Sequence, residues 1–191
     1  MKRADTGFAT LQRVPATLSF RRAQLSDVPA IVALVESAYR GEVSRAGWTT
    51  EADLLDGQRT DAAEVSALIG SEASGTRLIL GHAADELVCS ALLAREDDAA
   101  YLGMIAVRPG RQGLGVGAAL LAEAERVVRA EQLGTRLRMS VIAQRHELIA
   151  WYERRGFRQS GATEPFPYGD PRFGLPRRPD LYFRILVKEL A

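Results

Sequence analysis

Hydrophobic and polar positions divide this chain into short alternating stretches and longer stretches with helical periodicity. Residues 17–22 alternate apolar and polar side chains, as expected for a half-buried strand. Apolar residues then recur at the spacing of one helix face from Val28 to Tyr39, with Ser26 as the expected N-cap and Gly41 as the expected stop. The chain therefore opens with a strand followed by a helix.

The same two patterns continue to the end of the chain. Further strands are expected at residues 76–82, 87–94, 101–107, 136–141, 157–160 and 181–188. Further helices are expected at residues 60–69, about 118–131 and 147–155, and long loops at 41–60 and 163–180. A tight turn between the strands at 76–82 and 87–94 predicts a hairpin. Strands that alternate with helices in this way predict an α/β domain of about six or seven strands.

Composition is typical of a soluble globular domain. With 191 residues, 47% of them apolar and 26% charged, the chain is long enough to build one hydrophobic core. We expect residues 1–16 to form a flexible N-terminal arm without a signal peptide, and residues 17–191 to form a single domain. A formal net charge of +1 gives no general attraction to nucleic acid or to a membrane surface. No apolar run approaches the ~20 residues that cross a bilayer.

The single cysteine, Cys89, excludes an intrachain disulfide and fits a reducing compartment, so we expect a cytoplasmic location. Its expected strand face is apolar and also carries Leu87 and Leu93, which favours a buried structural thiol over a nucleophile. Neither His82 nor His146 has a cysteine or acidic residue at ligand spacing, so no metal site is expected.

Three glycines at alternate positions, Gly113, Gly115 and Gly117, lie between the expected strand at 101–107 and the helix that follows. A strand, a glycine-rich turn and a helix present backbone N–H groups to phosphate, and glycine lets phosphate oxygens approach the main chain. A Walker loop is excluded because two alanines follow Gly117. A dinucleotide fingerprint is excluded because the spacing is G-x-G-x-G and no carboxylate ends the next strand. The stretch therefore predicts another kind of phosphate ligand.

Two motifs resemble the GCN5-related N-acetyltransferase (GNAT) superfamily. The run Gln112-Gly-Leu-Gly-Val-Gly117 is similar to the family's phosphate motif Q/R-x-x-G-x-G/A, and Tyr152-Glu-Arg-Arg-Gly-Phe157 is similar to its Tyr-x-x-x-Gly-Phe. The order of elements also matches, so the resemblance covers residues 17–190, and it points to a bacterial small-molecule-type subgroup. It implies the GNAT fold, a mixed twisted sheet with helices on both faces.

The resemblance implies acetyl-CoA as the co-substrate. The acetyl group would pass directly to a primary amine of a small molecule, with no acyl-enzyme and no metal. Tyr152 would be the catalytic acid that protonates the thiolate, since an unperturbed phenol pKa of ~10 keeps it protonated at neutral pH. The expected cofactor-binding residues are Ile105, Ala106, Val107, Gln112, Gly113, Leu114, Gly115, Val116, Gly117, Ala118 and Arg145.

The acceptor site is expected between the loops at 41–60 and 163–180. Its expected substrate-binding residues are Trp48, Arg45 and Thr49, and further candidates for binding an anionic group are Arg172, Arg177 and Arg178. The lack of a long acidic or basic groove favours a small molecule over a peptide tail. A homodimer is compatible with the resemblance.

Two departures from the family pattern leave a second hypothesis open. The strand at 101–107 lacks the glutamate that many relatives place there as a base. Candidate bases in or beside the long loop are Glu42, Glu51, Asp53 and Asp61. Arg145 replaces an asparagine that contacts the cofactor in many relatives, and it would either meet a CoA phosphate or face solvent. The alternative function is therefore a non-catalytic acyl-CoA-binding sensor of the same fold.

Overall fold

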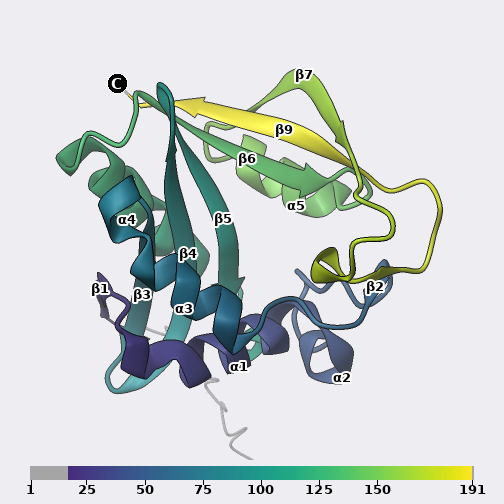
Figure 1. Ribbon diagram of the computed structural model, residues 1–191, viewed down its shortest axis with the longest axis horizontal. Helices are drawn as coiled ribbons and strands as arrows, with labels where there is room; N and C mark the ends of the chain where they lie inside the picture. The colour runs from purple at the N-terminus through teal and green to yellow at the C-terminus, as the bar shows by residue number, and fades with distance from the viewer. Residues whose placement is uncertain (1–16, 191) are drawn as a thin grey trace, which may run out of the picture.

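The computed structural model describes residues 17–190, with a seven-stranded sheet at its centre (Figure 1). The strands lie in the order β1-β3-β4-β5-β6-β9-β7, and each neighbouring pair is antiparallel except the parallel pair β5 and β6. Their bounds are β1 Leu18–Arg22, β3 Arg77–Ala83, β4 Glu86–Glu96, β5 Ala99–Val107, β6 Arg136–Ile142, β7 Arg158–Pro165 and β9 Tyr182–Glu189. A small second sheet pairs β2 (Leu55–Asp56) with β8 (Leu175–Pro176). The expected flexible arm at residues 1–16 lies outside the described residues.

Helices cover both faces of the large sheet (Figure 1). Their bounds are α1 Val28–Tyr39, α2 Gly41–Ser44, α3 Ala62–Gly70, α4 Val116–Ala130 and α5 His146–Glu153. Alternate strand residues enter two different cores, because successive side chains of a strand point to opposite faces. In β3, Leu78 and Leu80 join the core beside α1, whereas Ile79 joins the core beside α4. The predicted mixed sheet with helices on both faces is confirmed.

Three predicted boundaries differ from the structure. Ser26 is not the cap of α1, because a 3-10 turn at Leu25–Asp27 precedes the helix and Asp27 occupies its N-cap. Gly41 does not end α1, which already stops at Tyr39, and instead begins α2 with a φ of 65°. The helix expected at 60–69 begins at Ala62, because the Asp61 side chain caps it and accepts a hydrogen bond from the Glu64 N–H at 2.8 Å.

The loop expected at 163–180 contains more regular structure than its proline and glycine content suggests. Residues 163–165 continue β7, and a 3-10 turn at Pro171–Phe173 leads into β8. The strand expected at 157–160 is therefore longer than predicted. Its partner is β9, with a register shift between Gln159 and Thr163.

Cys89 is fully buried, as predicted, and burial raises the pKa of its thiol to about 12. The prediction that Leu87 shares its face is wrong, because Leu87 packs in the core beside α1 and Cys89 in the core beside α4. A register shift of β3 against β4 at residues 81–82 accompanies this change of face.

β5 and β6 separate after a short paired segment, and this separation creates the site. Their pairing is limited to three residue pairs, from Ala99–Arg136 to Tyr101–Arg138. Beyond these pairs the two strands diverge in Figure 1. In the same region the register of β5 against β4 shifts, and Met104 takes a left-handed φ of 45°. This irregularity bends β5 away from its parallel neighbour.

The difference in burial between two leucines predicts different losses of unfolding free energy when each is truncated to alanine. Leu120 of α4 is fully buried, whereas Leu25 is 64% exposed. We expect Leu120→Ala to lower the free energy of unfolding by about 2–5 kcal/mol. Leu25→Ala should change it by less than about 0.5 kcal/mol. Urea unfolding of both variants measures the difference, and equal losses would contradict the packing of α4 on the sheet.

Candidate functional site

A cavity of about 1110 Å³ lies between the separated strands β5 and β6. At one end it is lined by the glycine turn before α4, including Gly113 and Gly115. Tyr39 at the end of α1 and Arg59 before α3 line it as well, and these helices cover the opposite face of the sheet. The cavity therefore connects the two faces through the gap in the sheet.

The glycine turn before α4 combines left-handed glycines with open space. Gly113 and Gly115 have φ values of 77° and 84°, and a Cβ on either residue would meet no atom within 4 Å. Gly115 is the N-cap of α4, and the N–H of Ala119 donates to the Gly115 carbonyl at 3.0 Å. The N–H groups of residues 116–118 precede this first helical bond and have no acceptor within the helix. Open space, exposed N–H groups and the positive end of the helix dipole together favour a phosphate.

Gln112 has a structural role that the motif did not predict. Its amide nitrogen donates to the Val107 carbonyl at 3.1 Å and to the Thr49 hydroxyl at 2.8 Å. Its amide oxygen accepts from the N–H of Trp48 at 2.9 Å. At Gly47 a Cβ would lie 2.8 Å from the same amide, so a side chain at this position would displace the Gln112 amide. Gln112 thus fastens the loop at 47–49 to the end of β5.

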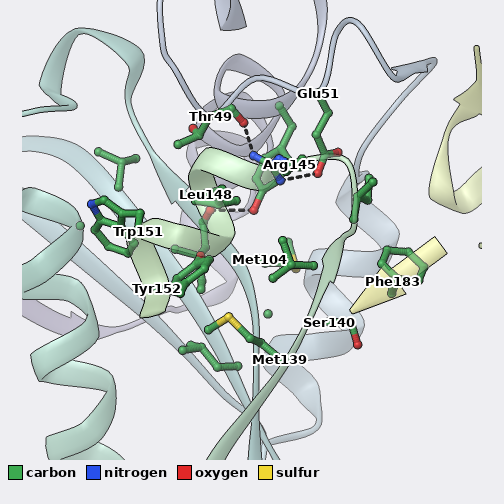
Figure 2. A pocket seen from close by; sticks show the side chains of 18 of the residues that line it. Thr49, Glu51, Met104, Met139, Ser140, Arg145, Leu148, Trp151, Tyr152 and Phe183 are labelled. Carbon is green, nitrogen blue, oxygen red and sulfur yellow. Dashed lines mark hydrogen bonds and ion pairs between the residues drawn. The ribbon is translucent and has the colours of Figure 1, made fainter. Parts of the chain in front are cut away.

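Tyr152 of α5 lies in the wall of the cavity and is only 4% exposed. Its ring contacts Trp151 and Phe157 edge-on, with centroid distances of 5.1 and 5.6 Å. Figure 2 shows it near Met104 of β5 and Met139 of β6. Burial, followed by the nearby Tyr39, raises the pKa of the Tyr152 phenol, so it is protonated at neutral pH. This is the protonation state that a general acid requires.

Glu51 is buried between two arginines that come from distant parts of the chain. One carboxylate oxygen lies 2.5 Å from Arg40 and the other 2.7 Å from Arg145, which also donates to the Thr49 carbonyl (Figure 2). Burial opposes ionisation of Glu51, but the charges of Arg145 and Arg40 outweigh it, so the pKa of Glu51 is lowered. Its oxygens are therefore occupied and weakly basic, which suits an anchor better than a base.

The other candidate bases do not line the cavity. Glu42 and Asp53 have side chains that are 90% and 74% exposed, and both pair with Arg45. Asp61 caps α3. Of the four acidic residues considered, the structure brings only Glu51 to the site, and its separation of 94 positions from Arg145 left no local signal for this pairing.

Tyr39 connects α1 to the strand that borders the gap. Its hydroxyl donates to the Ile105 carbonyl at 2.7 Å. Two guanidinium groups lie over its ring, those of Arg59 at 5.3 Å and Arg145 at 5.8 Å from the centroid. Sequence reasoning identified Tyr39 only as an apolar position of the helix and did not consider Arg59.

Most of the residues predicted to bind the cofactor line the cavity. They are Ile105, Val107, Gln112, Gly113, Gly115, Gly117, Ala118 and Arg145. The side chains of Ala106, Leu114 and Val116 pack into the two cores instead. Their backbone groups remain part of the strand and the turn. Arg145 does not face solvent, because Glu51 and Thr49 hold its guanidinium in the wall.

The predicted acceptor residues separate into two groups. Trp48 and Thr49 line the cavity, whereas Arg45 points outward and pairs with Asp53 at 2.7 Å. Three other arginines pair with nearby aspartates outside the cavity: Arg172, Arg177 and Arg178. Three phenylalanines that the sequence did not single out line it: Phe166, Phe173 and Phe183. They follow no motif, because they come from the loop at 166–181 and from β9.

Among residues 17–190, no group of three or more His, Cys, Asp or Glu side chains is placed to hold a metal ion. Within the same range, the structure contains no helix with the length and apolar character that a membrane crossing requires.

The buried ion pairs of Glu51 predict a pH-dependent stability. Glu51→Gln leaves two buried guanidinium groups without their anion and should lower the free energy of unfolding by about 3–5 kcal/mol at neutral pH. Because the pKa of Glu51 is lowered on folding, its contribution is complete above the ordinary value of 4.5 and is lost as the pH falls below it. The variant should therefore lose less stability on acidification than the unmodified chain.

Urea unfolding at a series of pH values measures this effect. Asp53→Asn is the matched control, because it removes an exposed carboxylate from the same loop and should cost less than about 1 kcal/mol. Equal costs for the two variants would show that the Glu51 pairs do not hold the loop.

Comparison with known proteins places this geometry in a family. A sequence model of the acetyltransferase (GNAT) family matches residues 34–157, more than half of the chain. No curated protein matches the chain.

Solved structures resemble it in fold. The ribosomal-protein-S18-alanine N-acetyltransferase from Escherichia coli is 18% identical with a TM-score of 0.66, over 92% of this chain and 95% of that chain. The protein yncA from Salmonella typhimurium is 16% identical with a TM-score of 0.68, again over 92% and 95%. The PaiA N-acetyltransferase from Thermoplasma acidophilum is 15% identical with a TM-score of 0.62, over 91% and 99%. With its motifs, its fold and the family match in agreement, the chain belongs to the acetyltransferase (GNAT) family.

Proposed function

We propose that this acetyltransferase moves the acetyl group of acetyl-CoA directly to a primary amine of a small molecule. The observation that carries the proposal is the single cavity that joins the glycine turn, through the gap between β5 and β6, to Tyr152. Such a path can hold an elongated phosphate-bearing donor with its reactive end beside a protonated phenol. It also leaves the opposite face of the sheet open to an acceptor.

The donor end fits acetyl-CoA in shape and charge. The N–H groups of residues 113–118 bind the pyrophosphate, and the edge of β5 at Ile105–Val107 lies beside the pantetheine arm. Two of the similar structures contain such a ligand: the Salmonella protein has its cofactor acetyl-CoA, and the Thermoplasma protein has coenzyme A. Arg145 supports the wall of the donor channel through Glu51 and Thr49.

The chemistry is a direct transfer. The amine nitrogen attacks the thioester carbonyl carbon, the new C–N bond forms, and the C–S bond breaks. Tyr152 gives its phenolic proton to the departing sulfur, and the proton lost by the amine passes to solvent, from which the phenolate is reprotonated. Glu51 takes no proton in this scheme, because both of its oxygens pair with arginines.

A small acceptor is favoured over a peptide by the structure around the acceptor end. Leu55 of β2 and Phe173, just before β8, both line the cavity, and the pairing of β2 with β8 joins their two loops. The N–H of Arg177 adds a further bond to the Leu54 carbonyl at 2.9 Å. We infer that these joined loops cover the acceptor end and leave room for a small molecule rather than a protein. The similar enzyme from E. coli differs in substrate, since its name describes acetylation of a ribosomal protein. The expected cytoplasmic location is compatible with a metabolite as acceptor.

The competing function is an acyl-CoA sensor without turnover, favoured because Glu51, the one candidate base of the long loop that lines the cavity, is paired with two arginines. Calorimetry with CoA and a thiol-release assay with acetyl-CoA and a panel of primary amines separate the two. A sensor would bind CoA tightly and release no thiol with any amine. Failure to bind CoA would contradict both functions.

The conformation of the glycine turn predicts a specific loss of CoA affinity. Gly115→Ala places a side chain at a φ of 84°. A left-handed conformation costs a non-glycine residue about 1–2 kcal/mol, so we expect the turn to relax in the free variant. Restoring the turn on binding would then weaken CoA affinity about tenfold by calorimetry. Gly110→Ala is the control, since its Cβ would also meet nothing within 4 Å but its φ is not in the left-handed region. Equal affinity in the two variants would contradict the role of the turn.

The proposed acid predicts a change in turnover rather than in donor affinity. Tyr152→Phe keeps the ring packed against Trp151 but removes the proton donor. We expect kcat for thiol release to fall by about 10²–10⁴-fold, while the Kd for CoA changes by less than about threefold. Tyr182→Phe, outside the cavity, should retain full turnover. Unchanged kcat in Tyr152→Phe would refute the acid assignment.

A further inference from the structure

Six arginines line the cavity, and four of them already have partners. Arg40 and Arg145 pair with Glu51, and Arg138 pairs with Glu164 and with Glu96. Arg155 lies 3.6 Å from the centroid of the Trp151 ring and donates to the Trp151 carbonyl. The two that remain are Arg59 and Arg154.

Arg59 differs from Arg154 in its surroundings. Arg154 follows α5 and is exposed, so water can solvate its charge. Arg59 is partly buried, and its guanidinium makes no direct hydrogen bond or ion pair with any residue in the described range 17–190. It lies over the Tyr39 ring, and burial, which lowers its pKa, is outweighed by the charges of Tyr39, Glu51 and Glu64 at longer range, so the pKa of Arg59 is raised. A cation removed from water is unfavourable unless an anion or hydrogen-bond acceptors compensate it. The cavity therefore holds a cation that no carboxylate of residues 17–190 contacts directly.

The main chain holds Arg59 in place. One oxygen of the Glu36 carboxylate accepts the N–H of Arg59 at 2.6 Å and the N–H of Thr60 at 2.9 Å. The Thr60 hydroxyl in turn donates to Glu64 at 2.7 Å. Glu36 lies on α1, so the segment is fastened to the helix that packs against the sheet. Because the backbone of Arg59 is anchored, less conformational freedom is lost on ligand binding than in a mobile loop.

Arg59 belongs to the acceptor side of the cavity. It precedes α3, which packs with α1 on one face of the sheet, whereas the glycine turn precedes α4 on the other face. Ser140 of β6 faces the same side as Arg59, because its neighbours Met139 and Val141 point into the core beside α4. The proposed pyrophosphate site and Arg59 therefore lie on opposite faces of the sheet, and the gap between β5 and β6 connects them.

From this arrangement we propose that the acceptor amine also carries a carboxylate, and that Arg59 binds this carboxylate while the amine faces the thioester. The proposal rests on the acetyl transfer proposed above and specifies its substrate class as small amino acids. A planar guanidinium matches one carboxylate with two parallel hydrogen bonds. A phosphate dianion would need a second cation, and the cavity arginines Arg40, Arg138 and Arg145 are already paired with carboxylates. Phe166 and Phe183 supply an apolar surface for the rest of the molecule.

Matched substrates test the proposal. Acetyl-CoA is offered with a panel of α- and ω-amino acids and with the carboxamide of each, and thiol release gives kcat/KM. We expect at least one amino acid to exceed its carboxamide by about tenfold or more, the usual effect of a charge-assisted pair. Arg59→Gln should lower kcat/KM for that acid by about 10–100-fold and leave its carboxamide within about threefold. Arg59→Lys keeps the charge but not the planar guanidinium, so its kcat/KM for the acid should lie between the values of the unmodified protein and of Arg59→Gln.

Arg154→Gln is the matched control, because it removes an exposed cavity arginine that also has no ion pair, and it should leave the ratio of acid to carboxamide unchanged. Calorimetric binding of the same acids to the CoA-saturated protein gives a readout that does not depend on turnover. Binding that requires Arg59 without thiol release would support the carboxylate site and contradict the proposed transfer. Turnover of amines with no preference for the acid, or an unchanged preference in Arg59→Gln, would overturn the carboxylate site and leave the transfer intact. If no amino acid binds and none is turned over, the carboxylate site is also overturned.

Discussion

The structure depends on the place where two parallel strands stop pairing. β5 and β6 share only three residue pairs, although each continues for several residues beyond them. Unpaired backbone groups in the interior of a protein are costly unless something else bonds to them. Two carbonyls at this end of β5 are bonded by side chains: the Ile105 carbonyl accepts the hydroxyl of Tyr39, and the Val107 carbonyl accepts the amide of Gln112. The gap in the sheet thus forms the site. It also removes strand pairing, so side-chain contacts must hold the neighbouring elements in place.

The residues that hold the site come from segments far apart in the chain. Glu51 lies between Arg40 at the end of α1 and Arg145 at the start of α5, and so fixes the long loop against both helices. A buried ion pair of this kind adds little net stability compared with apolar packing, but removing one partner is expensive. Its effect is therefore to select one arrangement of the loop, which is what a site built partly on a loop needs.

The periodic parts of the chain were predictable, and the contacts across the cavity were not. Alternation and helical spacing depend on neighbouring residues, so the seven strands and the main helices could be found. Errors lie at the ends, where the 3-10 turn at Leu25–Asp27 and the Asp61 cap decide the boundary. The glycine turn and Tyr152 were found because the motifs that carry them are short and continuous. Glu51, Arg59 and the amide of Gln112 bond to partners 94, 23 and 64 positions away, and neither composition nor local spacing predicts such pairs.

One side chain belongs to both halves of the site. Gln112 opens the turn proposed to hold the donor, and its amide also bonds to Trp48 and Thr49, which line the cavity from the long loop. A ligand that moves this amide shifts the loop, and a ligand that orders the loop fixes the amide. Because the free energy of coupling between two ligands is reciprocal, each substrate would then alter the affinity for the other by the same factor. In kinetic terms, the Gln112 bridge is a structural basis for coupled binding, in which the apparent affinity for each substrate depends on the concentration of the other.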